Sequence, residues 1–278
     1  MKRLLIAGYG DIARRAAPLL SSRFEIRPIS RSNGFDLDHP ASLESLDSTE
    51  ALLHCAPPPP DGQLDTRTAN LLAALERKRI LPTRIAYIST SGVYGDCGGA
   101  LVDETRAVNP QNARAARRVD AESRLALWCS RHGIALFILR APGIYAADRL
   151  PMERLRAGTP ALRAEDDVFT NHIHAEDLAG ACVRALEDGA EPGIYNASDD
   201  SRLKMGDWFD LVADRAGLPR PPRIRRSETA GRVPPGLMSF MNESRRLDNR
   251  RLKHVLGVRL RYPTVIQGLM HEHTAGVD

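Results

Sequence analysis

The sequence predicts an α/β protein, a doubly wound parallel sheet with helices on both faces and a small C-terminal substrate lobe. Short apolar runs alternate with longer amphipathic segments as far as Ala197, which is typical of strands alternating with helices. The apolar runs are rich in Leu, Ile and Ala and show little polar alternation, as expected for parallel strands that are covered on both faces. A glycine-rich turn joins the first run to the first amphipathic segment.

The elements follow in order along the chain. We expect strands at residues 3–7, 24–29, 51–56, 85–89, 134–139 and 193–196. The helices between them are expected at residues 11–20, 65–79, 113–131 and 175–187. Beyond Ala197, Arg, Pro and Gly become frequent and only two further helices are expected, at 205–216 and 249–256. We therefore expect a nucleotide-binding domain of residues 1–145 plus 171–198, and a smaller substrate-binding lobe of residues 146–170 plus 199–278.

Composition excludes several classes of protein. The chain has 278 residues, of which 42% are hydrophobic and 27% charged, as in a soluble globular protein. No apolar run approaches the roughly 20 residues that span a bilayer, and the N-terminus resembles a first strand more than a secretory signal. We expect a cytoplasmic protein without a membrane partner. The cysteines are too widely spaced for a disulfide framework or a zinc site, at Cys55, Cys97, Cys129 and Cys182.

The charge balance favours small anionic ligands. With 39 basic and 35 acidic residues, the formal net charge is +4. A nucleic-acid-binding protein would combine clustered basic residues with aromatic stacking residues, whereas only 5% of this chain is aromatic. We expect no nucleic-acid partner.

The glycine-rich turn has the pattern GxGxxA directly after a strand and at the start of a helix. The first glycine permits a tight turn, the second lets the backbone approach a pyrophosphate, and the alanine lets helix and strand pack closely. The alternative is a purely structural glycine turn. In a Rossmann-type fold, the residues expected to hold the bridging phosphates of a dinucleotide are Gly8, Tyr9, Gly10, Asp11, Ile12 and Ala13.

The residues after the second and third strands predict which dinucleotide binds. An NAD site usually has an acidic residue after the second strand, but Arg31 stands there between Ser30 and Ser32, which favours the 2′-phosphate of NADP over NAD. The alternative for Arg31 is a solvated arginine. We expect the adenine to be flanked by Asp36 and Leu37. After the third strand we expect a stiff wall beside the crevice, or else a rigid loop without ligand contact, at Cys55, Ala56 and Pro57.

Later motifs add a family resemblance that covers nearly the whole chain. They are STSGVYG at 89–95, LRAPGIY at 139–145, HIHAEDL at 172–178, YNASDD at 195–200 and RLDN at 246–249. Together they resemble the extended short-chain dehydrogenase/reductase family of nucleotide-sugar epimerases and dehydratases, in its atypical GxGxxA-bearing branch. The resemblance implies that Pro142, Gly143 and Ile144 contact the cofactor.

The resemblance also implies catalytic positions, and two of them depart from the family. Thr90, with Ser91 beside it, takes the place of the residue that hydrogen-bonds the reacting oxygen. Dehydratases have Asp-Glu directly after that position, so Ser91-Gly92 disfavours dehydratase chemistry. With Glu122 as the reference position, Arg114 and Arg118 replace the Tyr and Lys of the YxxxK pair.

Arginine cannot replace the tyrosine as an acid and base, because its pKa lies above about 12 and it does not exchange a proton at neutral pH. Arg118 could still bind the nicotinamide ribose, and Arg114 could grip an anionic substrate group. Among the other tyrosines near strand ends, Tyr94 is the best placed to supply a proton, although in the family that position usually packs or lines the site. The other two tyrosines near strand ends are Tyr87 and Tyr145.

The remaining motifs are open to structural interpretations. We interpret His172 and His174 as part of a hinge between the lobes, and we expect no metal. An arginine that neutralises a nucleotide diphosphate is expected among Arg220, Arg223 and Arg246, which the sequence cannot rank. By analogy with the family, we expect a homodimer through the helices at 65–79 and 113–131.

Two functions fit these observations. The first is an NADP-binding epimerase- or reductase-like protein with an atypical active site, acting on a carbonyl or hydroxyl group of a sugar-like or nucleotide-sugar-like substrate. The alternative is a non-catalytic NADP-binding sensor, which the missing Tyr–Lys pair favours. The sequence leaves open whether the protein is an enzyme.

Overall fold

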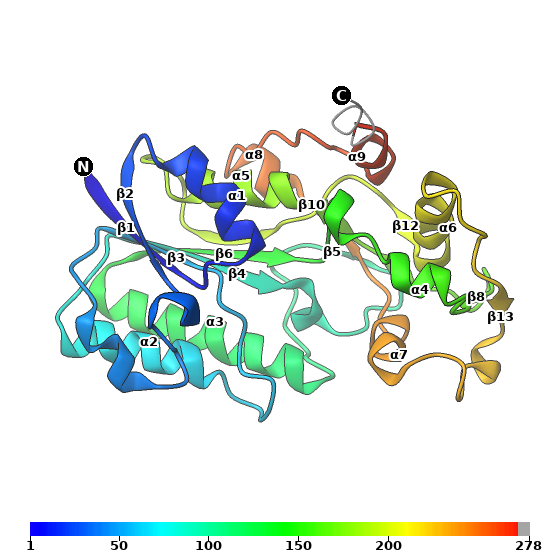
Figure 1. Cartoon of the computed structure of the whole chain (residues 1–278), viewed down its shortest axis with the longest axis horizontal. Coiled ribbons are helices and arrows are strands. Elements are labelled where there is room, and N and C mark those ends of the chain that lie inside the picture. Colours follow the sequence, from blue (N-terminus) through cyan, green and yellow to red (C-terminus); the bar gives the residue numbers. More distant parts are fainter. Residues whose placement is uncertain (272–278) are drawn as a thin grey trace.

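A six-stranded parallel sheet forms the centre of the protein, whose computed structural model describes residues 1–271 (Figure 1). The strand order is β11-β6-β4-β3-β1-β2, and every pair of neighbours is parallel. This arrangement confirms the predicted doubly wound α/β fold. The strands are β1 (Lys2–Ala7), β2 (Phe24–Ile29), β3 (Ala51–His54), β4 (Arg84–Thr90), β6 (Ala135–Ala141) and β11 (Gly193–Asn196).

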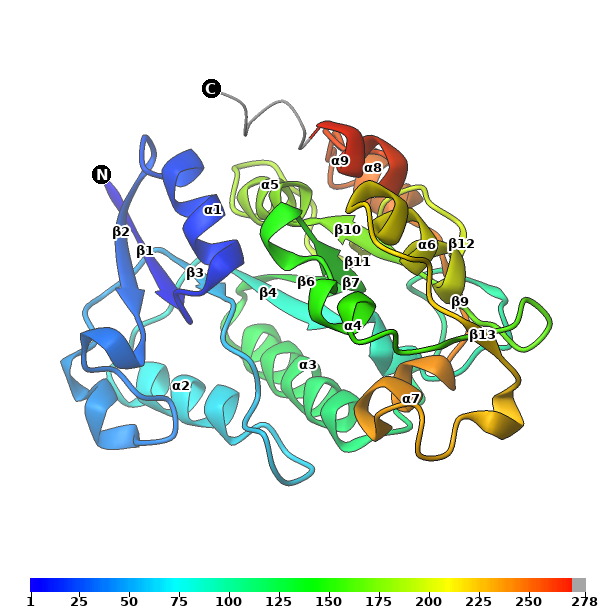
Figure 2. The same ribbon diagram turned by 45° about the vertical axis from the view of Figure 1, so that its right-hand side comes forward.

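Helices cover both faces of the sheet. On one face, α1 (Asp11–Leu20) packs beside α5 (Ala175–Ala185), and their small apolar residues form one hydrophobic cluster with β1 and β6 (Figure 2). On the other face, α2 (Thr66–Arg77) and α3 (Ala113–His132) form a second cluster with the opposite side of the strands. Because both faces are buried, the inner strands are mostly apolar, as their sequences predict, whereas the edge strand β2 carries the exposed Glu25 and Arg27.

The order of the strands places the ligand-binding crevice. Strand β1 pairs with β2 on one side and with β3 on the other, so the connection from β2 to β3 passes over β1. Ligands of open α/β sheets bind outside the carboxyl ends of the strands where such a reversal occurs. Strand β2 is an edge of the sheet, which is why it tolerates Pro28, a residue that cannot donate to a neighbouring strand.

Strand β3 is shorter than the expected strand at 51–56. The amides of Cys55 and Ala56 both donate to the carbonyl of Ala7, at 2.8 Å each, so the regular ladder stops at His54. The next residues turn across the end of β1.

A third hydrophobic cluster lies apart from the sheet and draws on two distant parts of the chain. It combines Leu155, Leu162 and Val168 with residues of the helix α6 (Met205–Arg215), among them Trp208 and Phe209. Two- and three-residue strands tie these segments together, and they are too short to leave a sequence pattern. They are β5 (Leu101–Val102), β7 (Gly143–Tyr145), β8 (Ala161–Leu162), β9 (Phe169–Thr170), β10 (His172–His174), β12 (Leu203–Lys204), β13 (Arg223–Ile224) and β14 (Arg246–Leu247).

Three short helices complete this part of the protein, namely α4 (Met152–Arg156), α7 (Pro235–Met241) and α9 (Val265–His271). A fourth short helix, α8 (Arg250–His254), packs instead on β11 with the first cluster. Within residues 1–271, no helix has the length and apolar character needed to cross a membrane.

Candidate functional site

The two glycines of the GxGxxA turn have different roles. Gly8 adopts φ +87°, and a Cβ added there would lie 2.5 Å from the Cα and N atoms of Ala56. The first glycine is therefore required by the close approach of the chain after β3. A Cβ added to Gly10 would meet nothing within 4 Å.

The start of α1 is consequently open. Gly10 is the residue before the helix, and no described side chain caps the first amides of α1. Free amides at a helix start attract a phosphate, and the missing Cβ of Gly10 leaves room for it to approach. These residues fit the bridging phosphates of a dinucleotide. Ile12 and Ala13 are buried against the sheet, so only their backbone amides face that position.

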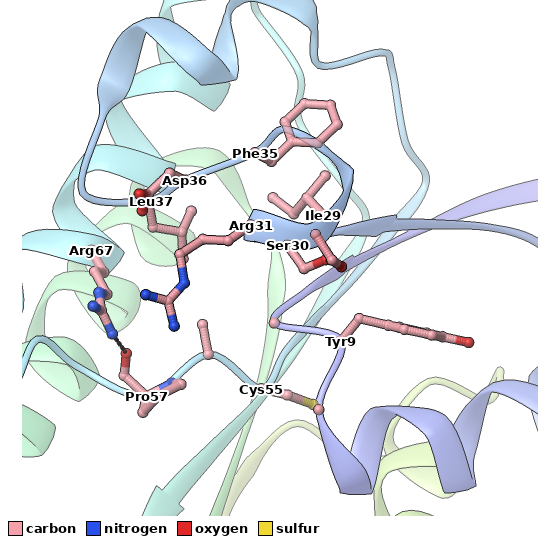
Figure 3. A pocket seen from close by; sticks show the side chains of 14 residues that line it. Tyr9, Ile29, Ser30, Arg31, Phe35, Asp36, Leu37, Cys55, Pro57 and Arg67 are labelled. Carbon is pink, nitrogen blue, oxygen red and sulfur yellow. Dashed lines mark hydrogen bonds between the residues drawn. The ribbon is translucent and has the colours of Figure 1, made fainter.

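A cavity of about 340 Å³ lies beyond the carboxyl ends of β1, β2 and β3 (Figure 3). It brings together most of the residues predicted to bind the adenosine half of a dinucleotide. Its other lining residues are Ile29, Phe35 and Arg67, which the sequence analysis did not single out. Arg67 lies in the first turn of α2, where a sequence pattern does not distinguish it from other exposed helix residues. The complete lining is Gly8, Tyr9, Gly10, Ile29, Ser30, Arg31, Ser32, Phe35, Asp36, Leu37, Cys55, Ala56, Pro57 and Arg67.

Two arginines bring positive charge to this cavity. The Arg31 side chain extends across it toward Arg67 and Pro57, whereas Tyr9 points away from them (Figure 3). Arg67 donates to both carboxylate oxygens of Asp38, at 2.9 and 2.6 Å, and to the carbonyl of Pro57 at 3.1 Å. Among the described residues, the Arg31 guanidinium has no ion-pair or hydrogen-bond partner. Its charge is therefore available to a ligand.

The neighbouring polar groups of the cavity are already engaged. The Asp36 carboxylate accepts from the amide of Asp38 at 3.0 Å and contacts His39 Nδ1 at 3.0 Å; these contacts lower the pKa of Asp36. The Ser30 hydroxyl lies 2.8 Å from that of Ser32. On the opposite wall, burial raises the pKa of Cys55 to about 12, so this thiol is no nucleophile at neutral pH.

The other half of the crevice lies at the ends of β4 and β6. Thr90 pairs in register with Ala141, which places it beside Pro142. The Thr90 hydroxyl accepts from the amide of Gly92 at 3.2 Å, and Ser91 is buried. Gly143 is exposed and Ile144 is half-buried at the start of β7. The structure thus brings Thr90 and the Pro142-Gly143-Ile144 turn together, but none of them lines the adenosine-side cavity.

Arg118 faces the end of β4 from helix α3. Its Nη1 donates to the carbonyl of Ile88 at 2.8 Å and to the hydroxyl of Tyr87 at 3.0 Å. Arg114 lies one turn earlier on the same face of the helix. It is exposed, and its guanidinium carbon lies 4.2 Å from the centre of the Phe240 ring on α7. Within residues 1–271, Arg114 has no hydrogen-bonded or ion-pair partner.

Three tyrosines lie near the strand ends, and two of them, Tyr87 and Tyr94, remain protonated at neutral pH. Burial raises the pKa of Tyr87 to about 12 and also raises the pKa of Tyr94. The Tyr94 ring is 1% exposed, and its hydroxyl donates to Asn196 Oδ1 at 2.8 Å. Tyr145 is also 1% exposed and donates to the carbonyl of Thr264. Tyr87 and Tyr94 therefore lack the lowered pKa that a proton-transferring tyrosine needs, and all three side chains are too buried to reach a substrate in the crevice.

A buried ion pair supports this half of the crevice from below. Glu122 on α3 accepts from Arg140 Nη2 at 2.6 Å and from the Ser89 hydroxyl at 2.5 Å. Both charged side chains are less than a tenth exposed. The pair joins α3 to the last residues of β4 and β6, so it fixes where Thr90 and Arg118 lie relative to one another.

The arginines considered as diphosphate ligands are all engaged elsewhere. Arg220 donates to Asp214 and Arg223 to Asp210, at 2.7 and 2.8 Å, on α6. Arg246 donates to the carbonyl of Gly99 at 2.8 Å.

His172 and His174, which the sequence predicts to belong to a hinge, lie in β10. Burial lowers the pKa of His172 to about 3, so this ring is neutral. His174 accepts from the amide of Glu176 at the start of α5, as expected of a residue that orients the backbone. The described residues contain no cluster of His, Cys, Asp and Glu that could hold a metal ion.

Comparisons with known proteins agree with this geometry. Residues 66–198 match the model of the NAD dependent epimerase/dehydratase family. A 3-diazoavenalumate denitrifying reductase from Streptomyces sp is 31% identical over 157 residues, which is 56% of this chain. The matched region covers 50% of that protein, so the chain spans about half the length of this curated relative.

Solved structures share the fold over nearly the whole chain. A functionally unknown conserved protein from Silicibacter pomeroyi DSS has a TM-score of 0.81 and 29% identity, with 99% of each chain covered. RMD from Pseudomonas aeruginosa, solved with NADPH, has a TM-score of 0.73 and 19% identity, with 96% of this chain and 97% of that chain covered. UDP-glucose 4-epimerase from Thermus thermophilus, solved with NAD, has a TM-score of 0.73 and 20% identity, with 99% and 100% covered.

The family match includes Thr90, Arg118 and the Pro142-Gly143-Ile144 turn, whereas the glycine turn and Arg31 precede it. The match to that family's model is confined to residues 66–198, and the solved structures show that the fold extends over nearly the whole chain.

Proposed function

We propose that this protein binds NADPH in the crevice and reduces a small anionic substrate. The observation that carries the cofactor assignment is the unpartnered Arg31 guanidinium, which extends across the adenosine-side cavity. The 2′-phosphate is the group that distinguishes NADPH from NADH, and arginine is the residue best suited to bind it. Arg67 adds a second positive charge, although its donors are shared with Asp38.

Each part of the cofactor has residues that suit it. The amides at the start of α1 would hold the bridging phosphates, and Asp36 and Leu37 would flank the adenine. Arg118 and the turn at Pro142 and Gly143 would hold the nicotinamide end. When bound there, NADPH supplies a hydride from C4 of its nicotinamide.

The chain's own residues favour reduction over epimerisation. An epimerase must remove a proton from a hydroxyl and later return it, which requires a base in the crevice. Arg114 and Arg118 cannot be such a base, and Tyr87 and Tyr94 are buried with raised pKa values. Reduction of a carbonyl needs only one proton, which goes to the substrate oxygen after the hydride has added to the carbon, and a diazo group that takes the hydride leaves as N2. Water can deliver that proton beside the Thr90 hydroxyl, since Thr90 is partly exposed.

Arg114 would define the substrate class. Its unpartnered guanidinium beside the exposed Phe240 ring suits a carboxylate or phosphate attached to an apolar or aromatic body. The reductase relative is named for 3-diazoavenalumate, which makes electrophilic carboxylates the first compounds to test. A nucleotide sugar is less favoured, because Arg220, Arg223 and Arg246 are engaged by other groups.

The test measures oxidation of NADPH at 340 nm with a panel of anionic carbonyl and diazo compounds. For an accepted substrate, Arg114→Gln is expected to raise KM at least tenfold and to leave the affinity for NADPH within twofold of the wild type. The control is Arg131→Gln at the exposed end of the same helix, which should change neither the KM for the substrate nor the affinity for NADPH. An unchanged KM in Arg114→Gln would remove Arg114 from the substrate site.

A non-catalytic NADPH sensor is the second candidate, favoured by the absence of the Tyr–Lys pair. It predicts NADPH binding with no turnover on any member of the panel. A thermal shift with NADPH that no candidate substrate alters further would support it. A sensor needs no substrate site beside the nicotinamide, so Arg114→Gln would then be silent in every assay.

We also propose an organisation for the rest of the chain. Residues 146–170 and 199–278 would form the substrate lobe, and this division is supported by the third hydrophobic cluster, which draws on both segments. A homodimer through α2 and α3 is supported by the exposed Leu127 on α3, and sedimentation velocity would test it. The cytoplasm is the location that this proposal assigns, because the protein would draw on its NADPH.

A further inference from the structure

Four charged side chains form a network at the start of α1. Asp11 and Arg15 belong to α1, whereas Asp148 and Arg149 belong to a short turn, η4 (Ala147–Arg149), that follows β7. Arg149 Nη1 donates to Asp11 Oδ2 at 2.8 Å, and Arg15 Nε donates to Asp11 Oδ1 at 2.9 Å. The network thus joins the glycine-turn helix to the segment between β7 and α4, which lies beside α1 in Figure 2.

The two arginines are held differently. Arg15 makes three hydrogen bonds, one to Asp11 and two to Asp148, the latter at 2.9 and 3.0 Å. Arg149 is joined to the network only through Asp11. The side chains of Arg15 and Arg149 are 24% and 37% exposed, respectively. Arg149 therefore gives up fewer hydrogen bonds than Arg15 if it exchanges its partner.

The position of Asp11 makes such an exchange favourable. Asp11 is the first residue of α1, next to Gly10 and the open amides that suit a phosphate. Without a ligand, a carboxylate there is favourable because it neutralises the positive end of the helix dipole. When a pyrophosphate binds, the same carboxylate repels it. An ion pair between a nearby guanidinium group and the phosphates is then more favourable than an ion pair between that group and Asp11.

We infer that Arg149 is a ligand of the cofactor's bridging phosphates. It pairs with Asp11 in the free protein and transfers that ion pair to the pyrophosphate on binding, while Arg15 keeps Asp11 and Asp148 in place. This inference rests on the proposed function, because it requires NADPH in the crevice. It adds a cation supplied by the segment after β7, so occupation of the cofactor site is coupled to the position of the chain that leads to α4.

The experiment compares two ligands by isothermal titration calorimetry. NADPH contains the bridging phosphates and the 2′-phosphate, whereas adenosine 2′-monophosphate contains only the latter. Arg149→Gln is expected to weaken NADPH binding five- to twentyfold and to leave adenosine 2′-monophosphate binding within twofold of the wild type. Arg156→Gln, a change to an exposed arginine at the end of α4, is the matched control and should leave both affinities within twofold.

Asp11→Asn is expected to change the affinity for NADPH in the opposite direction to Arg149→Gln. It removes the charge that competes for Arg149 and repels phosphate, so NADPH binding is expected to strengthen two- to fivefold. A weakening by this substitution would overturn the exchange. Equal loss of both ligands in Arg149→Gln would also overturn the inference, since the effect would then not be specific to the bridging phosphates.

The outcomes separate this inference from the function on which it rests. If the wild type fails to bind NADPH, the proposed function fails. If the wild type binds NADPH and Arg149→Gln binds it within twofold as well, Arg149 is not a ligand and the proposed function stands. Circular dichroism and the melting temperature of each variant verify that it is folded.

Discussion

The two halves of the crevice are built in different ways. At the adenosine half, the backbone defines the site: Gly8 is required by packing, Gly10 leaves a helix start open, and a cavity lies beyond three strand ends. At the proposed nicotinamide half, side chains define the site, and the family resemblance aligns Arg114 and Arg118 with the YxxxK pair. We infer that the scaffold for dinucleotide binding is kept, whereas the side chains that would transfer a proton are replaced.

The difference shows which parts of such a site a fold supplies by itself. A cradle of amides arises wherever a strand, a glycine turn and a helix follow one another with this spacing. Proton transfer depends on single side chains with shifted pKa values, which can be replaced without disturbing the backbone. The chemistry of this chain must therefore be inferred from those side chains and not from the fold.

The largest effect is expected from the support of the nicotinamide half. Glu122→Gln leaves the buried guanidinium of Arg140 without a counter-charge, which is expected to cost about 3–5 kcal/mol in the free energy of unfolding. The control is Arg124→Gln, which removes the more exposed pair with Asp120 on the same helix and should cost less than about 1 kcal/mol. Urea denaturation measures both. A loss below about 1 kcal/mol for Glu122→Gln would mean that this pair does not hold the site together.

The adenosine half offers a matched pair of glycines. Gly8 and Gly34 have almost the same conformation, with φ +87° and +88°, but only an added Cβ at Gly8 would overlap another backbone. Gly34→Ala is expected to cost about 1 kcal/mol, the ordinary penalty of an L residue in this region. Gly8→Ala is expected to cost about 3 kcal/mol, because the overlap with Ala56 adds to that penalty. Equal losses in denaturant titrations would show that the close approach does not constrain the turn.

These two regions also show how much the sequence could predict. The glycine turn, Arg31 and the residues after β3 were expected at one crevice and line one cavity, because short-range patterns and the parallel fold suffice to place strand ends together. The contribution of Arg67 depends on the way α2 packs over β2 and β3, which no local pattern encodes. The ion pair between Arg149 and Asp11 joins residues 138 positions apart, so only the folded chain reveals it.

A pH effect is expected where the two halves meet. His54 at the end of β3 is fully buried beside Tyr87, and burial lowers its pKa to about 4. The unfolded chain, with an ordinary value near 6.5, binds a proton that the native state rejects. The free energy contributed by neutral His54 is thus complete above about pH 6.5 and is lost as the pH falls toward 4, by up to about 3 kcal/mol.

His54→Asn cannot take up that proton. The difference in unfolding free energy between wild type and His54→Asn is therefore expected to shrink from pH 7 to pH 4. Denaturant titrations of both proteins at several pH values between 7 and 4 would measure this difference. A difference that is constant with pH would contradict a neutral buried His54.

The most direct test of NADPH binding through Arg31 is a titration of the wild type and of Arg31→Ala with NADPH and with NADH. The account predicts one molecule of NADPH per chain, bound at least tenfold more tightly than NADH by the wild type. Arg31→Ala should remove that preference, a change of about 1.4 kcal/mol or more, and should leave NADH binding within twofold. Absence of binding for both dinucleotides, or equal affinities in the wild type, would contradict it.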